Sequence, residues 1–290
     1  MKNERYEKIM NILAERGYAS VDRLSKELFV SMPTVRRDLN TMQDLGLVVR
    51  SHGGVMPRLS DMDGGPAVFR MGVNPQEKLK LDKAAAKLLR DNCMVFMDES
   101  TTTLHIIDQM SAYKNITVVT NNISVLQLAA KYRVPTICLG GETCYDTMSF
   151  YGYEAEELIT HFGIDIMFYS SSAITPGAWI ADYSARANAL RRRALQQADM
   201  KVFLCDKSKF LKSGAYMLMP LCEADHIITN AKLPDELNTG AARVTIVTSF
   251  PGFFHRIFLP VTSTVYMFFD TLYKASFVFL RHLRSLCGGT

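Results

Sequence analysis

A regular alternation of short apolar runs and amphipathic segments across residues 77–250 most constrains how this chain folds. The apolar runs have the length and composition of strands buried on both faces of a sheet. The segments between them repeat apolar residues at helical spacing. This alternation predicts an α/β fold with a largely parallel, Rossmann-like sheet and helices on both faces. The expected strands are 93–97, 116–119, 136–139, 164–169, 202–205, 226–228 and 243–247, and the expected helices are 77–92, 104–110, 124–132 and 185–200.

Small polar residues follow several of these strands, at the edge where ligands of parallel α/β sheets bind. Ser100, Thr101 and Thr102 stand at a strand-to-helix turn, where free N–H groups and hydroxyls suit a phosphate. Gly140 and Gly141 follow another strand and let the backbone approach a ligand closely. Their convergence at one edge predicts a site for a phosphorylated small molecule.

Two further pairs of residues belong to the expected site. Thr120 and Asn121 follow the second strand and are suited to bond the hydroxyls of a sugar. Lys209 follows the fifth strand and Arg192 lies on a helix, and either side chain is suited to neutralise an anion.

Residues 1–58 have a different pattern, in which three short amphipathic helices precede a β-hairpin. Ser20 and Ser31 are placed to cap the second and third helices, and Pro33 is tolerated in a first turn. Helix, helix, tight turn, helix and hairpin form a winged helix-turn-helix arrangement. The helices are expected over 5–16, 21–28 and 32–45, and the strands over 47–50 and 55–56.

The third helix has the features of a helix that reads DNA. Val35, Leu39, Met42 and Leu45 form its apolar stripe. The exposed candidates for DNA contact are Ser31, Thr34, Arg36 and Arg37 on the helix and Arg50 and His52 on the wing. The first residues of such a helix reach base edges in the major groove, and arginines bind guanine or phosphate. The alternatives are a solvated charged helix or a helical bundle that contacts only proteins.

Both halves of the chain resemble one family. In the first half, the spacing of Arg5, Ile9 and Leu13, the run 31–39 and the wing 50–54 resemble the DeoR-type helix-turn-helix signature. Asp38 is expected to pair with a neighbouring arginine or amide. In the second half, the resemblance to the DeoR-type sensor domain rests on Asp98-x-Ser100-Thr101-Thr102, Thr120-Asn121, Gly140-Gly141 and Asp206-x-Ser208-Lys209-Phe210.

This resemblance implies a sensor domain that is similar in fold to sugar-phosphate isomerases and that binds a phosphorylated sugar or related metabolite. It also adds Asp98 to the residues expected to contact the effector. The chain departs from the family pattern at Ala173, where glycine is usual, at Asn188, where an acid is usual, and at Asn230, where aspartate is usual.

These patterns divide the chain into four parts. A DNA-binding domain is expected over 1–58, a linker over 59–76, an effector-sensing domain over 77–250 and an atypical apolar and basic tail over 251–290. The tail is open to three interpretations: a peripheral or dimer-packing helix, a membrane span, or out-of-frame sequence. A span is disfavoured because Asp270 and Lys274 interrupt it.

Composition supports a protein of the cytoplasm. The net charge of +4 is mild, so a DNA-binding surface must be local. The six cysteines form no Cys-x-x-Cys pair, and the N-terminus carries no apolar signal segment, so we expect neither a metal nor secretion. No cofactor and no catalytic residue are expected.

The sequence therefore predicts a transcriptional regulator, in the first instance a repressor of carbohydrate-metabolism genes. Its expected partners are double-stranded operator DNA, a phosphorylated sugar effector and further copies of itself, as a dimer or tetramer. One alternative is a sugar-phosphate isomerase or hydrolase with a DNA-binding extension, for which Asp98 is the candidate base. Asp98 and Glu99 are expected to point apart at the strand end, so they would not form an acid/base pair. The other alternative is a membrane-associated regulator that uses the tail.

Overall fold

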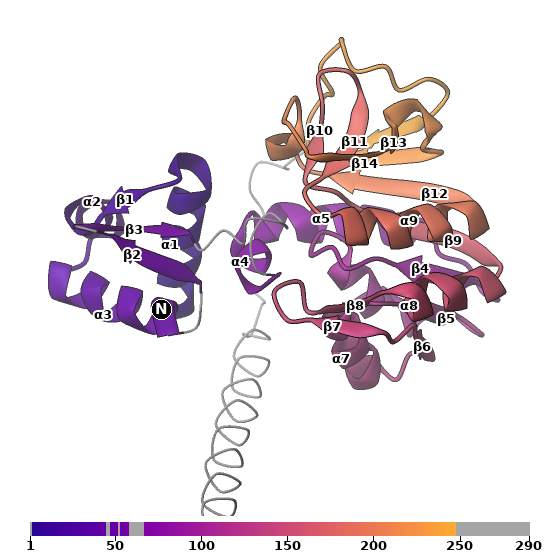
Figure 1. The fold of residues 1–290 in the computed structure, drawn as a ribbon, viewed down its shortest axis with the longest axis horizontal. Helices are drawn as coiled ribbons and strands as arrows, with labels where there is room; N and C mark the ends of the chain where they lie inside the picture. Colours follow the sequence, from indigo (N-terminus) through magenta and orange to yellow (C-terminus); the bar gives the residue numbers. More distant parts are fainter. Residues whose placement is uncertain (1, 45–46, 52, 58–66, 248–290) are drawn as a thin grey trace, which may run out of the picture. The chain divides into compact units, whose positions relative to one another are not determined.

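The computed structural model describes residues 2–44, 47–51, 53–57 and 67–247 (Figure 1). The expected helix end at Leu45, the wing residue His52, much of the expected linker and the tail over 251–290 lie outside the described residues. Among the helices of the described ranges, none has the length and apolar character needed to cross a membrane.

The N-terminal domain is a winged helix-turn-helix, as predicted. Three helices surround a three-stranded antiparallel sheet in the order β1-β3-β2. Its core combines the apolar faces of all three helices, including the predicted stripe of Val35, Leu39 and Met42. The elements are α1 (Lys2–Arg16), β1 (Ala19–Ser20), α2 (Val21–Leu28), α3 (Met32–Asp44), β2 (Val48–Ser51) and β3 (Gly54–Pro57).

Side-chain bonds fix the ends and the packing of these helices. The Ser20 hydroxyl accepts a hydrogen bond from the Arg23 amide at the start of α2. The Ser31 hydroxyl accepts one from the Thr34 amide at the start of α3. Asp38 is buried on α3 and receives two hydrogen bonds from the guanidinium of Arg5 on α1, at 2.8 and 3.2 Å. The predicted pairing of Asp38 with an arginine is thereby confirmed.

The second domain contains a seven-stranded parallel sheet in the order β15-β14-β12-β9-β4-β5-β6. Figure 1 shows several of these strands following one another across the domain. Each predicted strand is present, and every pairing in this sheet is parallel. The strands are β4 (Met94–Met97), β5 (Thr117–Thr120), β6 (Thr136–Cys138), β9 (Ile164–Tyr169), β12 (Ala198–Cys205), β14 (His226–Thr229) and β15 (Arg243–Ile246).

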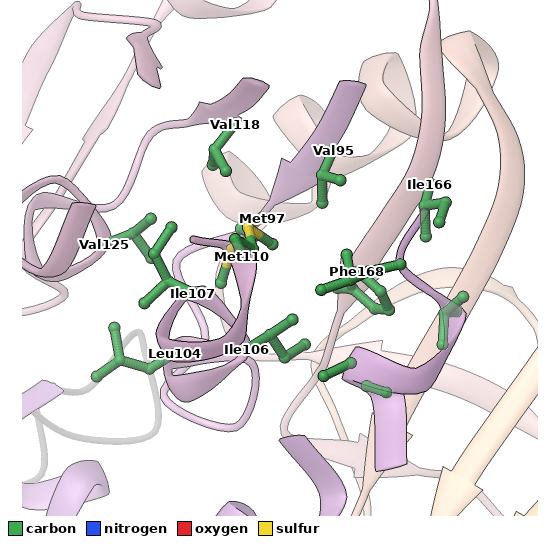
Figure 2. Close-up of a cluster of buried hydrophobic side chains, with 14 of the residues drawn as sticks. Val95, Met97, Leu104, Ile106, Ile107, Met110, Val118, Val125, Ile166 and Phe168 are labelled. Atoms are coloured by element: carbon green, nitrogen blue, oxygen red, sulfur yellow. The ribbon is translucent and has the colours of Figure 1, made fainter. Parts of the chain in front are cut away.

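Two hydrophobic cores lie on opposite faces of this sheet, because successive strand side chains point to opposite sides. Ile166 and Phe168 of β9 belong to one core, and Met167 and Tyr169 belong to the other. Figure 2 shows the first core, where strand side chains meet those of the segment from Leu104 to Met110. The covering helices are α5 (Pro75–Ala85), α6 (Ile107–Met110) and α7 (Ile123–Tyr132) on the first core and α8 (Tyr153–Leu158) and α9 (Ala185–Gln197) on the second.

Several predicted helix boundaries are wrong. The helix expected over 77–92 begins at Pro75, ends at Ala85 and continues as a 3₁₀ turn, Ala86–Leu88. The segment 104–110 begins with a 3₁₀ turn, Leu104–Ile106. The helix expected over 185–200 ends at Gln197, since Ala198 already pairs with Ile164 of β9.

Several small features were not predicted, among them β1 and α8. A hairpin of β7 (Glu142–Cys144) and β8 (Ser149–Tyr151) follows β6. A three-stranded antiparallel sheet joins β10 (Ala173–Ile174), β11 (Trp179–Asp182) and β13 (Tyr216–Pro220). A short helix, α4 (Ala67–Gly72), occupies part of the expected linker.

Phe168→Ala tests the core in Figure 2. Phe168 is fully buried on the central strand β9, so its truncation leaves a cavity and should lower the free energy of unfolding by about 3–5 kcal/mol. Chemical denaturation of the full chain measures this loss. Val244→Ala, on the half-exposed edge strand β15, is the control and should change stability by less than about 0.5 kcal/mol. Equal losses in the two variants would contradict the placement of the core.

Candidate functional site

The candidate DNA-binding surface lies on α3 and the wing. Arg36 and Arg37 are exposed, as expected for side chains off the apolar stripe. The Ser31 and Thr34 hydroxyls lie 2.9 Å apart at the start of the helix. Arg50 of β2 donates to the side-chain oxygen of Asn40 on α3, so the wing arginine lies against this helix. His52, the other predicted wing contact, lies outside the described residues.

The candidate effector site lies at the carboxyl edge of the parallel sheet, and its centre is the turn after β4. Asp98 organises this turn with both oxygens. Its Oδ1 accepts from the Ser100 amide and the Thr103 hydroxyl, and its Oδ2 accepts from the Ser170 amide and the Arg191 Nε. Asp98 is fully buried, so it serves as an anchor of the turn. The structure gives no free oxygen of Asp98 for the effector contact that the sequence predicted.

Two lysines, of which Lys78 is buried and Lys209 is partly buried, reach the hydroxyls of this turn. The Nζ of Lys209 lies 3.1 Å from the Thr102 hydroxyl and 2.6 Å from the Ser170 hydroxyl. The Nζ of Lys78, on α5, lies 3.0 Å from the Thr101 hydroxyl and also donates to the Arg70 carbonyl. The sequence predicted Lys209 here, whereas Lys78 was missed because it lies before β4 in the chain.

The electrostatics of this region favour an anion. The pKa of Lys78 is lowered to about 7, mainly by burial and also by the nearby charges of Lys209 and Arg70, which two neighbouring carboxylates partly offset. Burial also lowers the pKa of Lys209, partly offset by Asp206. Burial raises the pKa of Asp206, but Lys209 and hydrogen bonds from Ser208 outweigh this effect and lower it.

Arg70 adds unused donors to this group of cations. Its Nε and one Nη are buried and have no hydrogen-bond partner within the part of the chain that the structure describes. Buried donors without partners are costly, and an anion would satisfy them. We call Arg70, Lys78 and Lys209 the cation cluster.

A second buried charge group lies beside the turn. Arg191 of α9 donates to Asp98 Oδ2 at 3.0 Å, to Asp182 Oδ2 at 2.8 Å and to Glu99 Oε1. Asp98 and Glu99 therefore converge on one guanidinium, and the expectation that they point apart is wrong. The backbone leaves the strand conformation after Met97, so strand alternation no longer applies.

The predicted anion ligand Arg192 lies on the exposed side of α9. Arg192 is exposed and donates to the Met217 carbonyl, while its neighbour Arg191 points into the domain. Adjacent residues on a helix point about 100° apart, so one position decides between solvent and core.

The predicted site residues Thr120 and Asn121 differ in whether their polar atoms are available to a ligand. Thr120 is fully buried, and its hydroxyl donates to the Met97 carbonyl and accepts from the Asn122 amide, so it is structural. Asn121 donates to the Phe150 carbonyl and leaves its Oδ1 without a partner among the described residues.

The two glycines also differ. A Cβ at Gly141 would lie 2.5 Å from the Tyr151 carbonyl, so this glycine allows β8 to pack. Gly140 has a φ of +66° and open space where a Cβ would stand, so the backbone is accessible from that side.

At two positions where the chain departs from the family pattern, the side chain has a hydrogen-bond partner within the domain. The Asn188 amide donates to the Tyr216 carbonyl, and the Asn230 amide donates to Glu77 Oε2 at 3.1 Å. A carboxylate at either position would lack this donor. Ala173 is fully buried in β10. No group of three or more His, Cys, Asp or Glu side chains suited to a metal occurs within the described ranges.

Comparisons with known proteins agree with both domains. Residues 5–57 match the model of the DeoR-like helix-turn-helix domain, and residues 73–231 match the model of the DeoR C terminal sensor domain. The chain belongs to the DeoR family. It is therefore a transcriptional regulator with a DNA-binding domain of the DeoR type.

Two named relatives align with most of the chain, and one solved structure aligns with 47% of it. The L-fucose operon activator of Haemophilus influenzae is 30% identical over 247 residues, which is 85% of this chain and 99% of that protein. The putative aga operon transcriptional repressor of Escherichia coli O157:H7 is 27% identical over 84% of this chain and 92% of its own length. Ribose 5-phosphate isomerase A of Methanocaldococcus jannaschii, at 17% identity, covers 47% of this chain and 55% of its own, with a TM-score of 0.36.

Arg191→Ala tests the buried charge group. It leaves three carboxylates buried without their cation and should lower the free energy of unfolding by about 3–5 kcal/mol. Without the guanidinium, the pKa of Asp182 is no longer held down, and the pKa of Glu99, which burial already raises to about 7, rises further, so the loss should be larger at pH 8 than at pH 5. Denaturation at both pH values measures it. Arg193→Ala, an exposed change on α9, is the control, and a loss independent of pH would contradict the arrangement.

Proposed function

We propose that this protein represses carbohydrate-metabolism genes by binding operator DNA through α3 and the wing, and that a phosphorylated sugar in the second domain controls this binding. The observation that carries the proposal is the cation cluster around the turn after β4. Its two lysines contact Thr101 and Thr102, and two buried nitrogens of Arg70 lack partners among the described residues. Charged donors that converge on a turn rich in hydroxyls suit a phosphate.

The names of the relatives support a role in sugar metabolism. One is named an activator of the L-fucose operon, one a putative repressor of the aga operon and one a glycerol-3-phosphate regulon repressor. Between activation and repression of transcription, we propose repression. We also propose that the protein works in the cytoplasm as a homo-oligomer, because a helix-turn-helix dimer reads two half-sites.

The geometry lends no support to the enzyme alternative through Asp98. Both oxygens of this carboxylate already accept hydrogen bonds, so it is not poised to remove a proton from a ligand. The relatives that cover most of the chain are named as regulators.

Arg36→Ala and Arg37→Ala test the DNA-binding surface. Each substitution should weaken binding to DNA from upstream of the protein's own gene by about 1–3 kcal/mol if the arginine contacts a base. A mobility-shift titration at fixed salt measures the change. The matched control is Arg193→Ala, an exposed arginine of the second domain, which should bind as the unchanged protein does. Unchanged binding by both test variants would exclude α3 as the reading helix.

Lys78→Met tests the cation cluster. We expect fructose 6-phosphate, glucose 6-phosphate, ribose 5-phosphate or glucitol 6-phosphate to bind the full chain in titration calorimetry, and the variant to lose most of that affinity. Because the pKa of Lys78 is about 7, its charge is lost as pH rises, so binding should weaken from pH 7 to 9 and less steeply in the variant. The ligand phosphate, with a second pKa of about 6, keeps its charge in that range.

Lys87→Met, an exposed change, is the control for this experiment and should bind normally. If the unchanged protein bound none of the four compounds, the proposed phosphorylated effector would be rejected. If a compound bound equally well to Lys78→Met, the cation cluster would not be its site.

A further inference from the structure

Three buried polar atoms beside the turn after β4 have no hydrogen-bond partner among the described residues. They are Oε2 of Glu99, Oδ1 of Asn121 and the hydroxyl of Tyr151. All three side chains are almost completely buried. Native proteins leave few such atoms unsatisfied, so a group of them calls for a physical explanation.

The three residues come from neighbouring segments. Glu99 follows β4, and Asn121 follows β5, which pairs with β4. Tyr151 ends β8, and its neighbour Phe150 exchanges hydrogen bonds with Asn121 through its amide and its carbonyl. Burial raises the pKa of Tyr151, and the charge of Glu99 raises it further, while two hydroxyls of the same hairpin lower it.

The side chains of Glu99 and Asn121 are each held in one orientation by a hydrogen bond to their other polar atom. Arg191 binds Oε1 of Glu99, which leaves Oε2 directed elsewhere. The Phe150 carbonyl binds the amide nitrogen of Asn121, which assigns the free position to its oxygen. These acceptors are therefore in place before any ligand arrives.

The chemistry of the three atoms defines what satisfies them. Glu99 and Asn121 offer acceptors, and the Tyr151 hydroxyl donates or accepts. An alcohol hydroxyl donates to an acceptor and also accepts from a phenol, so a chain of hydroxyls satisfies all three. A hydrocarbon chain satisfies none of them. The group adjoins Ser100, the first residue of the hydroxyl-bearing turn.

We propose that Glu99, Asn121 and Tyr151 form a hydroxyl-recognition subsite, through which the protein selects polyhydroxylated ligands. This inference rests on the proposed function in that the cation cluster holds the phosphate of the same ligand. Glu99 sets the specificity, because Arg191 fixes its orientation and its other oxygen has no hydrogen-bond partner among the described residues.

The test compares two ligands of equal length in titration calorimetry on the full chain. One is the tightest binder among fructose 6-phosphate, glucose 6-phosphate, ribose 5-phosphate and glucitol 6-phosphate. The other is the n-hexyl or n-pentyl phosphate with the same number of carbons. At pH 8, above the pKa of about 7 to which burial raises Glu99, the unchanged protein should prefer the hydroxylated ligand by at least about tenfold, since a hydrogen bond to a charged group is worth roughly that factor.

Glu99→Gln replaces the free acceptor with an amide that keeps the same shape. We expect it to reduce the preference about tenfold while inorganic phosphate binds within about twofold of the unchanged protein. Tyr151→Phe should reduce the preference by a smaller factor, and Glu236→Gln, an exposed change, should leave it intact. Circular dichroism confirms that each variant is folded.

The outcomes separate the two proposals. If Glu99→Gln kept the full preference, or if the unchanged protein showed none, the subsite would be rejected while the phosphate site stood. If no phosphate bound but free glucitol bound and lost affinity in Glu99→Gln, the subsite would stand and the phosphorylated effector would be rejected. If neither phosphates nor glucitol bound the unchanged protein, both proposals would be overturned.

Discussion

The buried guanidinium of Arg191 is the interaction on which the carboxyl edge of the sheet depends. It binds Asp98 and Glu99 after β4 and Asp182 at the end of β11, so it joins segments far apart in the sequence. The planar fork of an arginine supplies several fixed donors at once, which a lysine does not. Because Asp98 also holds the Ser100 amide, the charge of Arg191 determines the position of the turn.

Local patterns were sufficient to predict most of the fold. Every strand of the parallel sheet contains a short apolar stretch, and the winged helix-turn-helix has its capping serines and its signature within one short domain. The strands of the two small sheets were missed because they are short and depend on partners distant in sequence. The helix end near Ala198 was misplaced because pairing with Ile164 outweighs the local preference for a helix.

The sequence predicted the location of the site more successfully than the role of each residue in it. Polar residues after parallel strands do meet at one edge, but hydrogen bonds decide which of them remain available. The side chains of Asp98 and Thr120 are occupied by hydrogen bonds within the protein, while the side-chain oxygen of Asn121 has no partner among the described residues. Arg70 and Lys78 precede the first strand of the sheet in the chain. No spacing in the sequence indicates that they lie at its carboxyl edge.

The direct junction between α9 and β12 has a consequence for tolerance to mutation. Gln197 ends the helix and Ala198 begins the strand, so no loop absorbs an inserted or deleted residue. A slip of one residue along β12 would exchange the side chains of the two cores, because neighbours on a strand face opposite sides. It would also displace Lys209 along the edge. The junction therefore fixes the register of β12, and insertions or deletions are confined to other connections of the domain.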